Sequence, residues 1–413
     1  MKKEEVLQII NQQPKWYQKI QLPFGLETPG RDRSQTANRI FPADLKGAGV
    51  LDVGCAEGFF CFEAKRRNAG KVVGLDLDGD RQRTATKLAK VFGFEIEFLQ
   101  GSVIDSEGLG MFDYVLCLNI LHHVTDPIGI IHKLINITRE RLVLEVADIG
   151  MGIADIGRKR KSRAVLGWWG PLFKLLPSDL RPGILAVDSR GRFLLTRNWI
   201  KNLVQNQYCD IERVEFVDSE LKHRYLALAS MRKLSALRFI SRPTNVGKSE
   251  FVNLLKSGDP EVCRLIGLNL QDGWQVMTAS NLQTGAVEGV NRLVMEYDIC
   301  RTILRRYGDY QYDPALAIKR VADKKTVYVL VCPVDSLVGR VRAALNSNQN
   351  PERKHYRKAE RMIFEYSQPG RLRNLYEGWI SYCKENGFEL RYIDVSSRNV
   401  KSVTGKEALL LVS

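Results

Sequence analysis

The sequence predicts an α/β protein with two domains, each built on a mostly parallel sheet. Between residues 49 and 147, short apolar runs alternate with helical segments, a pattern typical of parallel strands joined by crossover helices. A second strand, loop and helix pattern begins near residue 236 around Gly247-Lys248-Ser249. Because 413 residues exceed what one hydrophobic core commonly serves, we expect two domains.

The elements of the first domain follow from these patterns. Strands are expected at 49–53, 71–75, 95–99, 112–118 and 140–147. Residues 148–192 break the alternation and are interpreted as an insertion, after which Thr196 is expected to cap a helix near 197–206. Two strand-like runs near 211–217 and 223–231 predict an antiparallel hairpin that closes the sheet. The predicted organisation is a cap and lead-in at 1–48, a first domain at 49–235 and a second domain at 236–413.

A glycine turn after the first strand is the most informative feature of the chain. It reads Asp52-Val53-Gly54-Cys55-Ala56-Glu57-Gly58, and the next strand ends at Asp76. Glycines let the backbone turn sharply and approach a ligand, while a carboxylate roughly 20 residues on can accept hydrogen bonds from ribose hydroxyls. The spacing Gly-x-x-x-Gly differs from the dinucleotide fingerprint Gly-x-Gly-x-x-Gly. The expected ligand is therefore S-adenosylmethionine.

These residues resemble motif I and its acidic partner in class I S-adenosylmethionine-dependent methyltransferases. Phe112 to Leu118 is similar to the fourth strand of that family, and Leu121 to Pro127 to the segment that follows it. The resemblance implies a Rossmann-like methyltransferase sheet. It also implies a set of cofactor-binding residues, namely Asp52, Gly54, Cys55, Ala56, Gly58, Asp76, Leu77, Ser102, Val103 and Asn119.

The lead-in from Lys15 to Gly30 is similar to that of methyltransferases related to the tRNA wobble-uridine modification enzymes. This resemblance introduces a tRNA-modifying methyltransferase as an alternative function. Trp16, Tyr17 and Lys19 in the same segment are candidates for one wall of the substrate pocket, and packing of an N-terminal helix on the sheet is the alternative.

His122 and His123 are the candidate catalytic residues, because they follow the fourth strand at the edge of the sheet where ligands bind. Either imidazole could deprotonate an acceptor hydroxyl or amine. The alternative is that both histidines only pack against the cofactor. Methyl transfer from an activated sulfonium can depend on positioning without a dedicated base.

In the second domain, the strand at 236–241 leads into Arg242-Pro243-Thr244-Asn245-Val246-Gly247-Lys248-Ser249, followed by a helix. This order resembles the phosphate-binding loop of small P-loop kinases, with Arg242 in place of the first glycine. The resemblance implies that ATP or GTP binds with magnesium, or that the loop is structural only. The candidate nucleotide-binding residues are Asn245, Gly247, Lys248 and Ser249, and the candidate magnesium ligands are Ser249, Glu296 and Asp298.

The charge of the chain favours anionic partners. It has 62 Lys and Arg against 47 Asp and Glu, a formal net charge of +15. A basic cluster at 158–163 precedes Trp168 and Trp169. A substrate lid, a nucleic-acid contact, a peripheral membrane contact through 158–173 and a solvated loop all remain open. An anionic glycan is a further candidate partner.

The cysteines and apolar segments indicate a reduced, cytoplasmic protein. The eight cysteines form no Cys-x-x-Cys pair, which argues against a disulfide framework or a zinc site. No signal peptide is recognised at the N-terminus, and no run reaches the roughly 20 apolar residues of a membrane span.

We therefore expect a methyltransferase acting on an unidentified, anionic or polymeric acceptor, fused to an NTP-binding kinase-like domain. Two alternatives remain at this stage. One is a tRNA-modifying methyltransferase with a non-catalytic second domain, and the other is a non-catalytic binding module.

Overall fold

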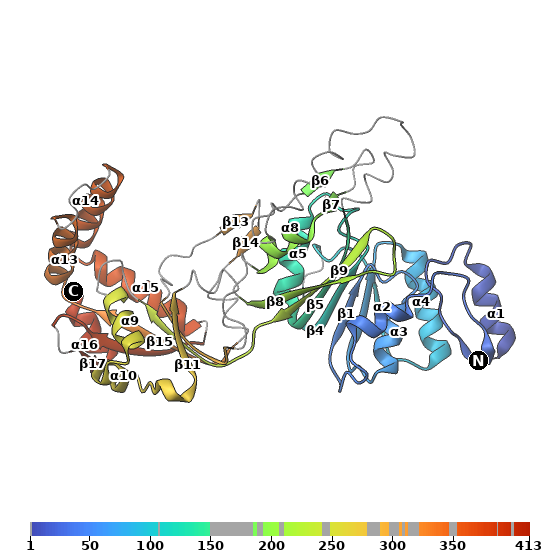
Figure 1. The fold of residues 1–413 in the computed structure, drawn as a ribbon, viewed down its shortest axis with the longest axis horizontal. Coiled ribbons are helices and arrows are strands. Elements are labelled where there is room, and N and C mark those ends of the chain that lie inside the picture. The colour runs from blue at the N-terminus through green and yellow to red at the C-terminus, as the bar shows by residue number, and fades with distance from the viewer. Residues whose placement is uncertain are drawn as a thin grey trace, which may run out of the picture. The chain divides into compact units, whose positions relative to one another are not determined.

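The computed structural model divides the chain into two compact units. They are Met1–Arg232 with Arg306–Tyr312, and Lys233–Arg305 with Asp313–Ser413. In Figure 1 the first unit is mostly blue to green and the second mostly yellow to red. The described residues are 2–105, 108–148, 185–187, 193–205, 210–241, 248–278, 290–296, 305–307, 310–312, 322–346, 353–385, 387–397 and 400–413.

A seven-stranded sheet forms the centre of the first unit, in the order β3-β2-β1-β4-β5-β9-β8. Strands β1 to β5 are parallel, β9 is antiparallel to β5, and β8 is antiparallel to β9 and so runs in the direction of β1 to β5. The strands are β1 (Val50–Val53), β2 (Val72–Asp76), β3 (Glu97–Gln100), β4 (Phe112–Leu118), β5 (Thr138–Ala147), β8 (Ile211–Asp218) and β9 (Arg224–Met231). The predicted α/β sheet with its closing hairpin is confirmed.

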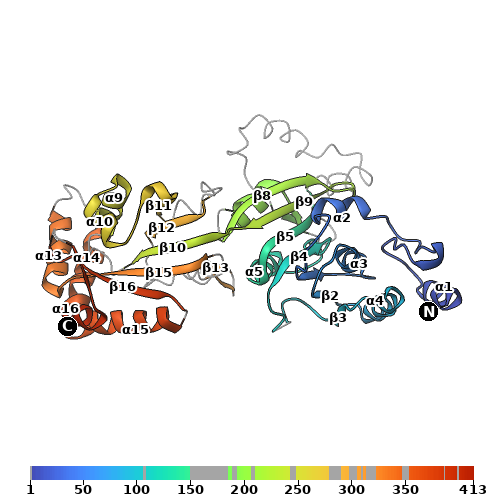
Figure 2. The same cartoon turned by 90° about the horizontal axis from the view of Figure 1, so that it is seen from below.

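Helices flank this sheet on both faces, with α3 and α4 against β1 to β3 and α5 against β4 and β5 (Figures 1 and 2). The chain moves from β1 to β2 and β3 on one side, then to β4 and β5 on the other, so right-handed crossovers place these helices on opposite faces. The helices are α1 (Lys3–Gln12), α2 (Ser34–Ile40), α3 (Phe59–Arg66), α4 (Gly79–Phe92), α5 (Pro127–Ile137) and α8 (Arg197–Ile200).

Local sequence explains where two of these helices begin. Asp78 caps α4, since its side chain accepts hydrogen bonds from the backbone N–H groups of Asp80 and Arg81. Asp126 caps α5 in the same way, and Pro127 occupies the first helical turn, where its missing N–H costs nothing. Thr196 caps α8 as predicted, but the regular helix ends at Ile200 and continues as a π-helical turn over Lys201–Gln205.

Two short antiparallel ribbons complete the described part of the first unit. One pairs β6 (Leu185–Val187) with β7 (Phe193–Leu195), and the other pairs β13 (Arg305–Tyr307) with β14 (Tyr310–Tyr312). Most of the predicted insertion at 148–192, including the basic cluster and both tryptophans, lies outside the described residues.

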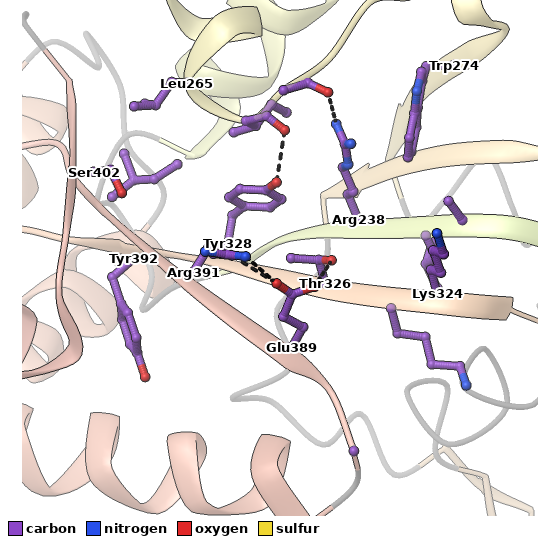
Figure 3. Close-up of a pocket in the computed structure, with 17 residues that line it drawn as sticks. Arg238, Leu265, Trp274, Lys324, Thr326, Tyr328, Glu389, Arg391, Tyr392 and Ser402 are labelled. Carbon is purple, nitrogen blue, oxygen red and sulfur yellow. Dashed lines mark hydrogen bonds and ion pairs between the residues drawn. The ribbon is translucent and has the colours of Figure 1, made fainter.

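The second unit has a six-stranded sheet in the order β11-β12-β10-β15-β16-β17. All neighbours are parallel except β17, which is antiparallel to β16. Its strands are β10 (Leu234–Ser241), β11 (Trp274–Thr278), β12 (Arg292–Glu296), β15 (Ala322–Val331), β16 (Glu389–Asp394) and β17 (Lys401–Val403). A cavity opens on this sheet and is drawn in Figure 3.

The helices of the second unit are α9 (Lys248–Ser257), α10 (Pro260–Leu265), α13 (Val334–Asn346), α14 (Arg353–Ser367), α15 (Arg371–Glu385) and α16 (Gly405–Leu411). Among the described residues, none of the helices combines the length and the apolar character that crossing a membrane requires. Six of the eight cysteines are described, and all six are buried free thiols.

Candidate active site

A cavity of about 400 Å³ lies at the carboxyl ends of β1, β2 and β4. Because the strand order reverses between β1 and β4, this is the switch point of the sheet, where α/β folds bind ligands. The volume is within the range of small-molecule sites. The lining residues are Lys15, Tyr17, Val53, Gly54, Ala56, Leu75, Asp76, Leu77, Arg81, Gly101, Ser102, Val103, Leu118, Asn119, Ile120, His123, Val124 and Ile130.

Asp76 ends β2 and faces the glycine turn. Its Oδ2 accepts a hydrogen bond from the backbone N–H of Ala56 at 2.8 Å, and its Oδ1 accepts one from the N–H of Asp78 at 2.9 Å. Each carboxylate oxygen has further acceptor capacity. The residue thus presents a fixed acceptor at the cavity wall, as a ribose hydroxyl pair requires.

The turn itself depends on glycine. Gly54 has φ +75°, and a Cβ there would lie 2.2 Å from Cδ1 of Ile120, which lines the same cavity. Gly58 has φ +91° and precedes α3, where a Cβ would approach the Phe98 ring to 2.9 Å. An L-residue would be strained at either position. The turn therefore leaves room for a ligand close to its backbone at Gly54.

Asp52 does not line the cavity, although the resemblance implied a role for it at the cofactor. It is 1% exposed in the middle of β1, and Cys61 Sγ donates to its Oδ2 at 3.9 Å. Burial and, to a lesser degree, the negative charge of Asp76 together raise the pKa of the Asp52 carboxyl to about 7. Cys55 and Gly58 also lie behind the cavity wall and not on it.

The two predicted catalytic histidines differ in position. His123 lines the cavity, whereas His122 lies outside its wall, with the two ring centroids 4.0 Å apart. Asn119 precedes them with φ +65°, an unusual value for a non-glycine residue that is frequent at functional sites. His123 is therefore the histidine that can reach a substrate in this cavity.

The lead-in forms one wall of the cavity, in line with the prediction for Tyr17. The backbone N–H of Tyr17 donates to Glu57 Oε1 at 3.2 Å, and the Tyr17 hydroxyl accepts from Asn119 Nδ2 at 3.0 Å. Phe59 N–H donates to Gln18 Oε1 at 3.0 Å. Glu57 is fully buried, and burial raises its pKa. Side chains from both segments thus tie the lead-in to the glycine turn and to the end of β4.

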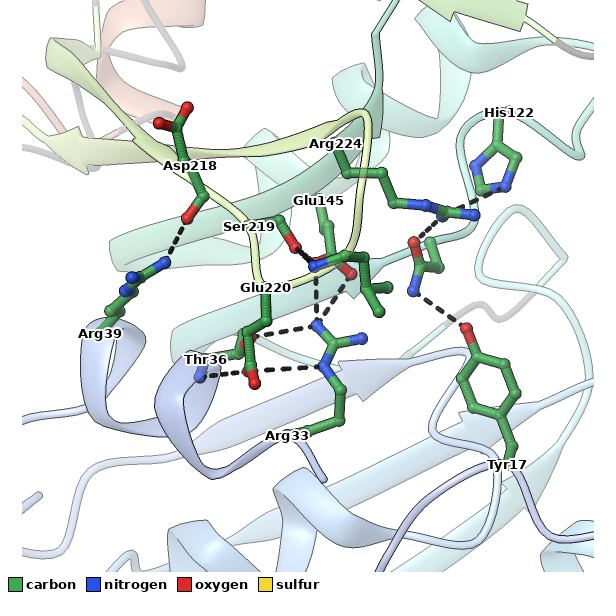
Figure 4. A network of polar contacts seen from close by, with 12 residues as sticks. Tyr17, Arg33, Thr36, Arg39, His122, Glu145, Asp218, Ser219, Glu220 and Arg224 are labelled. Carbon is green, nitrogen blue, oxygen red and sulfur yellow. Dashed lines mark hydrogen bonds and ion pairs between the residues drawn. The ribbon is translucent and has the colours of Figure 1, made fainter. Parts of the chain in front are cut away.

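A polar network lies beside this wall (Figure 4). Arg224, the first residue of β9, donates to Asn119 Oδ1, and its Nη1 lies 3.4 Å from His122 Nε2. Burial lowers the pKa of Arg224. Among the described residues, no carboxylate lies within 4 Å of its guanidinium, because Glu145 pairs with Arg33 at 2.8 Å. A half-buried cation without an ion-pair partner favours an anion nearby.

The second unit has its own candidate site at the carboxyl ends of β10 and β12. Lys248 Nζ lies 3.3 Å from Glu296 Oε1, and Ser249 Oγ donates to the same oxygen at 3.5 Å. β10 is central, with β12 on one side and β15 on the other, so these residues also lie at a switch point. The predicted residues Asn245, Gly247 and Asp298 lie outside the described residues.

The structure thus brings together seven of the ten predicted cofactor residues and one of the two predicted histidines around one cavity. It also adds residues that sequence reasoning missed. Arg81 and Ile120 line the cavity, and Arg224 contacts Asn119. Arg224 follows Asn119 by 105 residues, and no local pattern marks such a contact.

Comparison with known proteins gives three findings. Residues 44–163 match a family model described as a methyltransferase domain. The chain is 33% identical over 100 residues to a ubiquinone biosynthesis O-methyltransferase of Neisseria meningitidis, which is 24% of this chain and 42% of the relative. It is 34% identical over 91 residues to the protein of the same name from Vibrio parahaemolyticus, which is 22% of this chain and 38% of the relative. The matched segments span about two fifths of these relatives.

Solved structures give a weaker likeness. The N-terminal domain of EvdMO1, solved in the presence of SAH and D-fucose, has 15% identity and a TM-score of 0.42, covering 56% of this chain and 98% of that one. The magnesium protoporphyrin IX methyltransferase of Synechocystis with bound SAH has 18% identity and a TM-score of 0.33, covering 48% and 78%. The residues that match the methyltransferase family model, 44–163, belong to the first unit.

Proposed function

We propose that the first unit is an S-adenosylmethionine-dependent methyltransferase that methylates a hydroxyl oxygen of an anionic acceptor. The observation that carries the cofactor part is Asp76, fixed at the tip of β2 opposite the glycine turn. The methyltransferase family match supports it. The names of the O-methyltransferase relatives support oxygen as the accepting atom.

The residues around the cavity fit this cofactor. Asp76 can accept hydrogen bonds from a ribose, Gly54 leaves backbone space, and the exposed Leu77 offers an apolar surface at the cavity mouth. When bound, S-adenosylmethionine supplies an activated methyl group on its sulfonium. His123 then lies where a side chain could accept the proton of the acceptor hydroxyl. Arg224 supports the anionic character of the acceptor.

The test is binding of S-adenosylhomocysteine, measured by calorimetry. Asp76→Asn keeps the shape of the side chain and removes its charge, and charged hydrogen bonds contribute about 1.5–3 kcal/mol. We expect the affinity to fall by about 10- to 100-fold. Asp80→Asn, a change of the same kind at an exposed residue of α4, should leave it unchanged. Equal affinity in wild type and Asp76→Asn would contradict the proposed pocket.

We further propose that the second unit binds ATP or GTP with magnesium. The supporting observation is the arrangement of Lys248, Ser249 and Glu296. A lysine that follows a loop can reach terminal phosphates, and a serine hydroxyl and a strand-end carboxylate are suitable magnesium partners. The Lys248–Glu296 ion pair would open when phosphates and magnesium provide partners of opposite charge for each.

Lys248→Ala is expected to abolish magnesium-dependent ATP or GTP binding, because Lys248 is the candidate phosphate contact of this site. Lys256→Ala, at the exposed end of α9, should have no effect. Calorimetric titration of each protein with ATP and with GTP, with and without magnesium, measures this binding. If wild type binds neither nucleotide, the second unit has no nucleotide site and the non-catalytic alternative stands.

A further inference from the structure

A second cavity lies on the sheet of the second unit, away from Lys248 and Glu296. Its volume is about 590 Å³, which is typical of small-molecule sites. The lining residues of β10, Ala236, Leu237 and Arg238, are the third to fifth residues of the strand, whereas Lys248 and Glu296 lie at the carboxyl ends of β10 and β12. Figure 3 shows Arg238, Lys324, Tyr328, Glu389 and Arg391 along neighbouring strands.

Strand register places most of these polar side chains on one face. Ala236 pairs with Lys324, and Arg238 pairs with Thr326, which in turn pairs with Glu389. Paired residues of neighbouring strands point to the same side of a sheet. This face of the sheet therefore presents charged side chains. A face covered by packed helices would instead require apolar side chains.

Positive charge exceeds negative charge in this cavity. Glu389 is the one carboxylate among its lining residues, and it already accepts from Arg391 Nε at 3.0 Å and from Thr326 Oγ1 at 3.3 Å. In the described part of the chain, neither Arg238 nor Lys324 has a carboxylate within 4 Å. Burial lowers the pKa of Arg238, while Tyr328 raises it in part. The walls would thus be stabilised by an added anion.

Arg238 is held in a fixed position. Its Nη1 donates to the carbonyl oxygen of Gly267 at 2.8 Å, and its Cζ lies 4.1 Å from the centre of the Trp274 ring. The Tyr328 hydroxyl donates to the carbonyl oxygen of Ile266 at 2.9 Å, so the same loop is fixed from a second strand. A guanidinium has five N–H donors, and those that remain can bind an anion with little further loss of freedom.

We propose that this cavity binds a small anion with two or more phosphate or carboxylate groups, and that Arg238 and Lys324 contact those groups. Phosphate and carboxylate share the chemistry that an arginine recognises. The site is distinct from the proposed nucleotide site and does not depend on it.

The experiment is calorimetric titration of the full-length protein with pyrophosphate and with citrate, at constant ionic strength. We expect at least one of them to bind wild type, and the better probe identifies the anionic group as phosphate or carboxylate. Arg238→Gln and Lys324→Gln should each weaken binding by about 10- to 100-fold. Arg264→Gln, an exposed residue of α10 that does not line the cavity, is the matched control and should bind as wild type.

One further variant, together with Lys324→Gln, makes the result decisive. Lys248→Ala should leave this binding intact, which separates the cavity from the proposed nucleotide site. Lys324 is exposed, so Lys324→Gln should fold even if Arg238→Gln does not. The proposal is overturned if neither probe binds wild type, if Lys324→Gln binds as tightly as wild type, or if Lys248→Ala removes the binding.

Discussion

Asp52 is a carboxyl group in the middle of a buried strand, and its ionisation should give stability a pH dependence. Its pKa is about 7 in the folded protein, against an ordinary value of 3.8. Between these two values the folded state holds a proton that the unfolded state has lost. The free energy of unfolding should therefore fall as pH rises from about 4 to about 7 through this group, and be constant above that.

Asp52→Asn should remove this slope, since the amide has the shape of the carboxyl but does not ionise. Relative to wild type, the variant should gain stability toward pH 8, on the order of 4 kcal/mol at 1.36 kcal/mol per pKa unit. Urea denaturation from pH 4.5 to 8.5 measures the difference. Asp80→Asn, at an exposed residue, should follow wild type at every pH. If the free energy of unfolding changed with pH in the same way in wild type and Asp52→Asn, Asp52 would have an ordinary pKa in the folded protein.

At the level of single residues, the sequence predicted a site from one turn and the strand that follows it. Gly54, Ala56 and Asp76 lie within 23 residues of each other and line one cavity. Arg224 and Asn119 are 105 residues apart, and only the antiparallel pairing of β9 with β5 brings them together. Such a contact depends on the whole sheet and has no signature in either segment.

Among the elements, α4 offers the cleanest test of local stability, because it begins directly after the Asp76 strand. Asp78 Oδ1 accepts from Asp80 N–H at 3.0 Å and from Arg81 N–H at 3.3 Å. Asp78→Ala should lower the free energy of unfolding of the first unit by about 1 kcal/mol. Asp80→Ala removes an exposed carboxylate from the same turn without removing the cap, and should cost less than about 0.5 kcal/mol. Denaturant unfolding measures both, and equal losses would contradict the capping role.

Element boundaries show where tertiary pairing prevails over local sequence. β15 begins at Ala322, so it includes the polar residues Lys324 and Lys325 before its apolar residues. Nothing in that run is typical of a strand, but Leu234 and Ala236 of β10 provide its backbone partners. The strands β1, β2 and β4 consist mostly of apolar residues. Their own sequences were therefore enough to predict them as buried strands.

At the scale of the whole molecule, the described residues form two large sheets, each with its own buried strands. One buried cluster, which includes Val50, Phe62 and Leu228, lies entirely in the first unit, while Leu237, Phe239 and Val329 are buried in the second. Two domains were expected from chain length alone, and the alternation of strands and helices predicted the sheet of the first. The sequence could not predict that residues 306–312 group with the first unit, because no pattern links so short a segment to a distant sheet.

Two cores of this kind should unfold in two resolvable transitions, since domains with their own cores need not unfold together. Matched cap variants can assign each transition. Asp78 caps α4 in the first unit, and Asp259 caps α10 in the second, where its Oδ1 accepts from Glu261 and Val262 N–H groups at 3.1 and 3.0 Å. Each Asp→Ala change should lower the free energy of unfolding of its unit by about 1 kcal/mol. For units of this size, that corresponds to a melting temperature lower by roughly 2–4 °C.

In scanning calorimetry of the full-length protein, Asp78→Ala should lower the midpoint temperature of one transition, and Asp259→Ala should lower that of the other. The double variant should show both shifts at their individual sizes, because caps in separate cores share no partners. S-adenosylhomocysteine should raise only the transition that Asp78→Ala lowers, since a ligand stabilises the unit that binds it. A single transition that both variants lower alike would mean that the two units unfold as one, and the cofactor would then stabilise the whole chain.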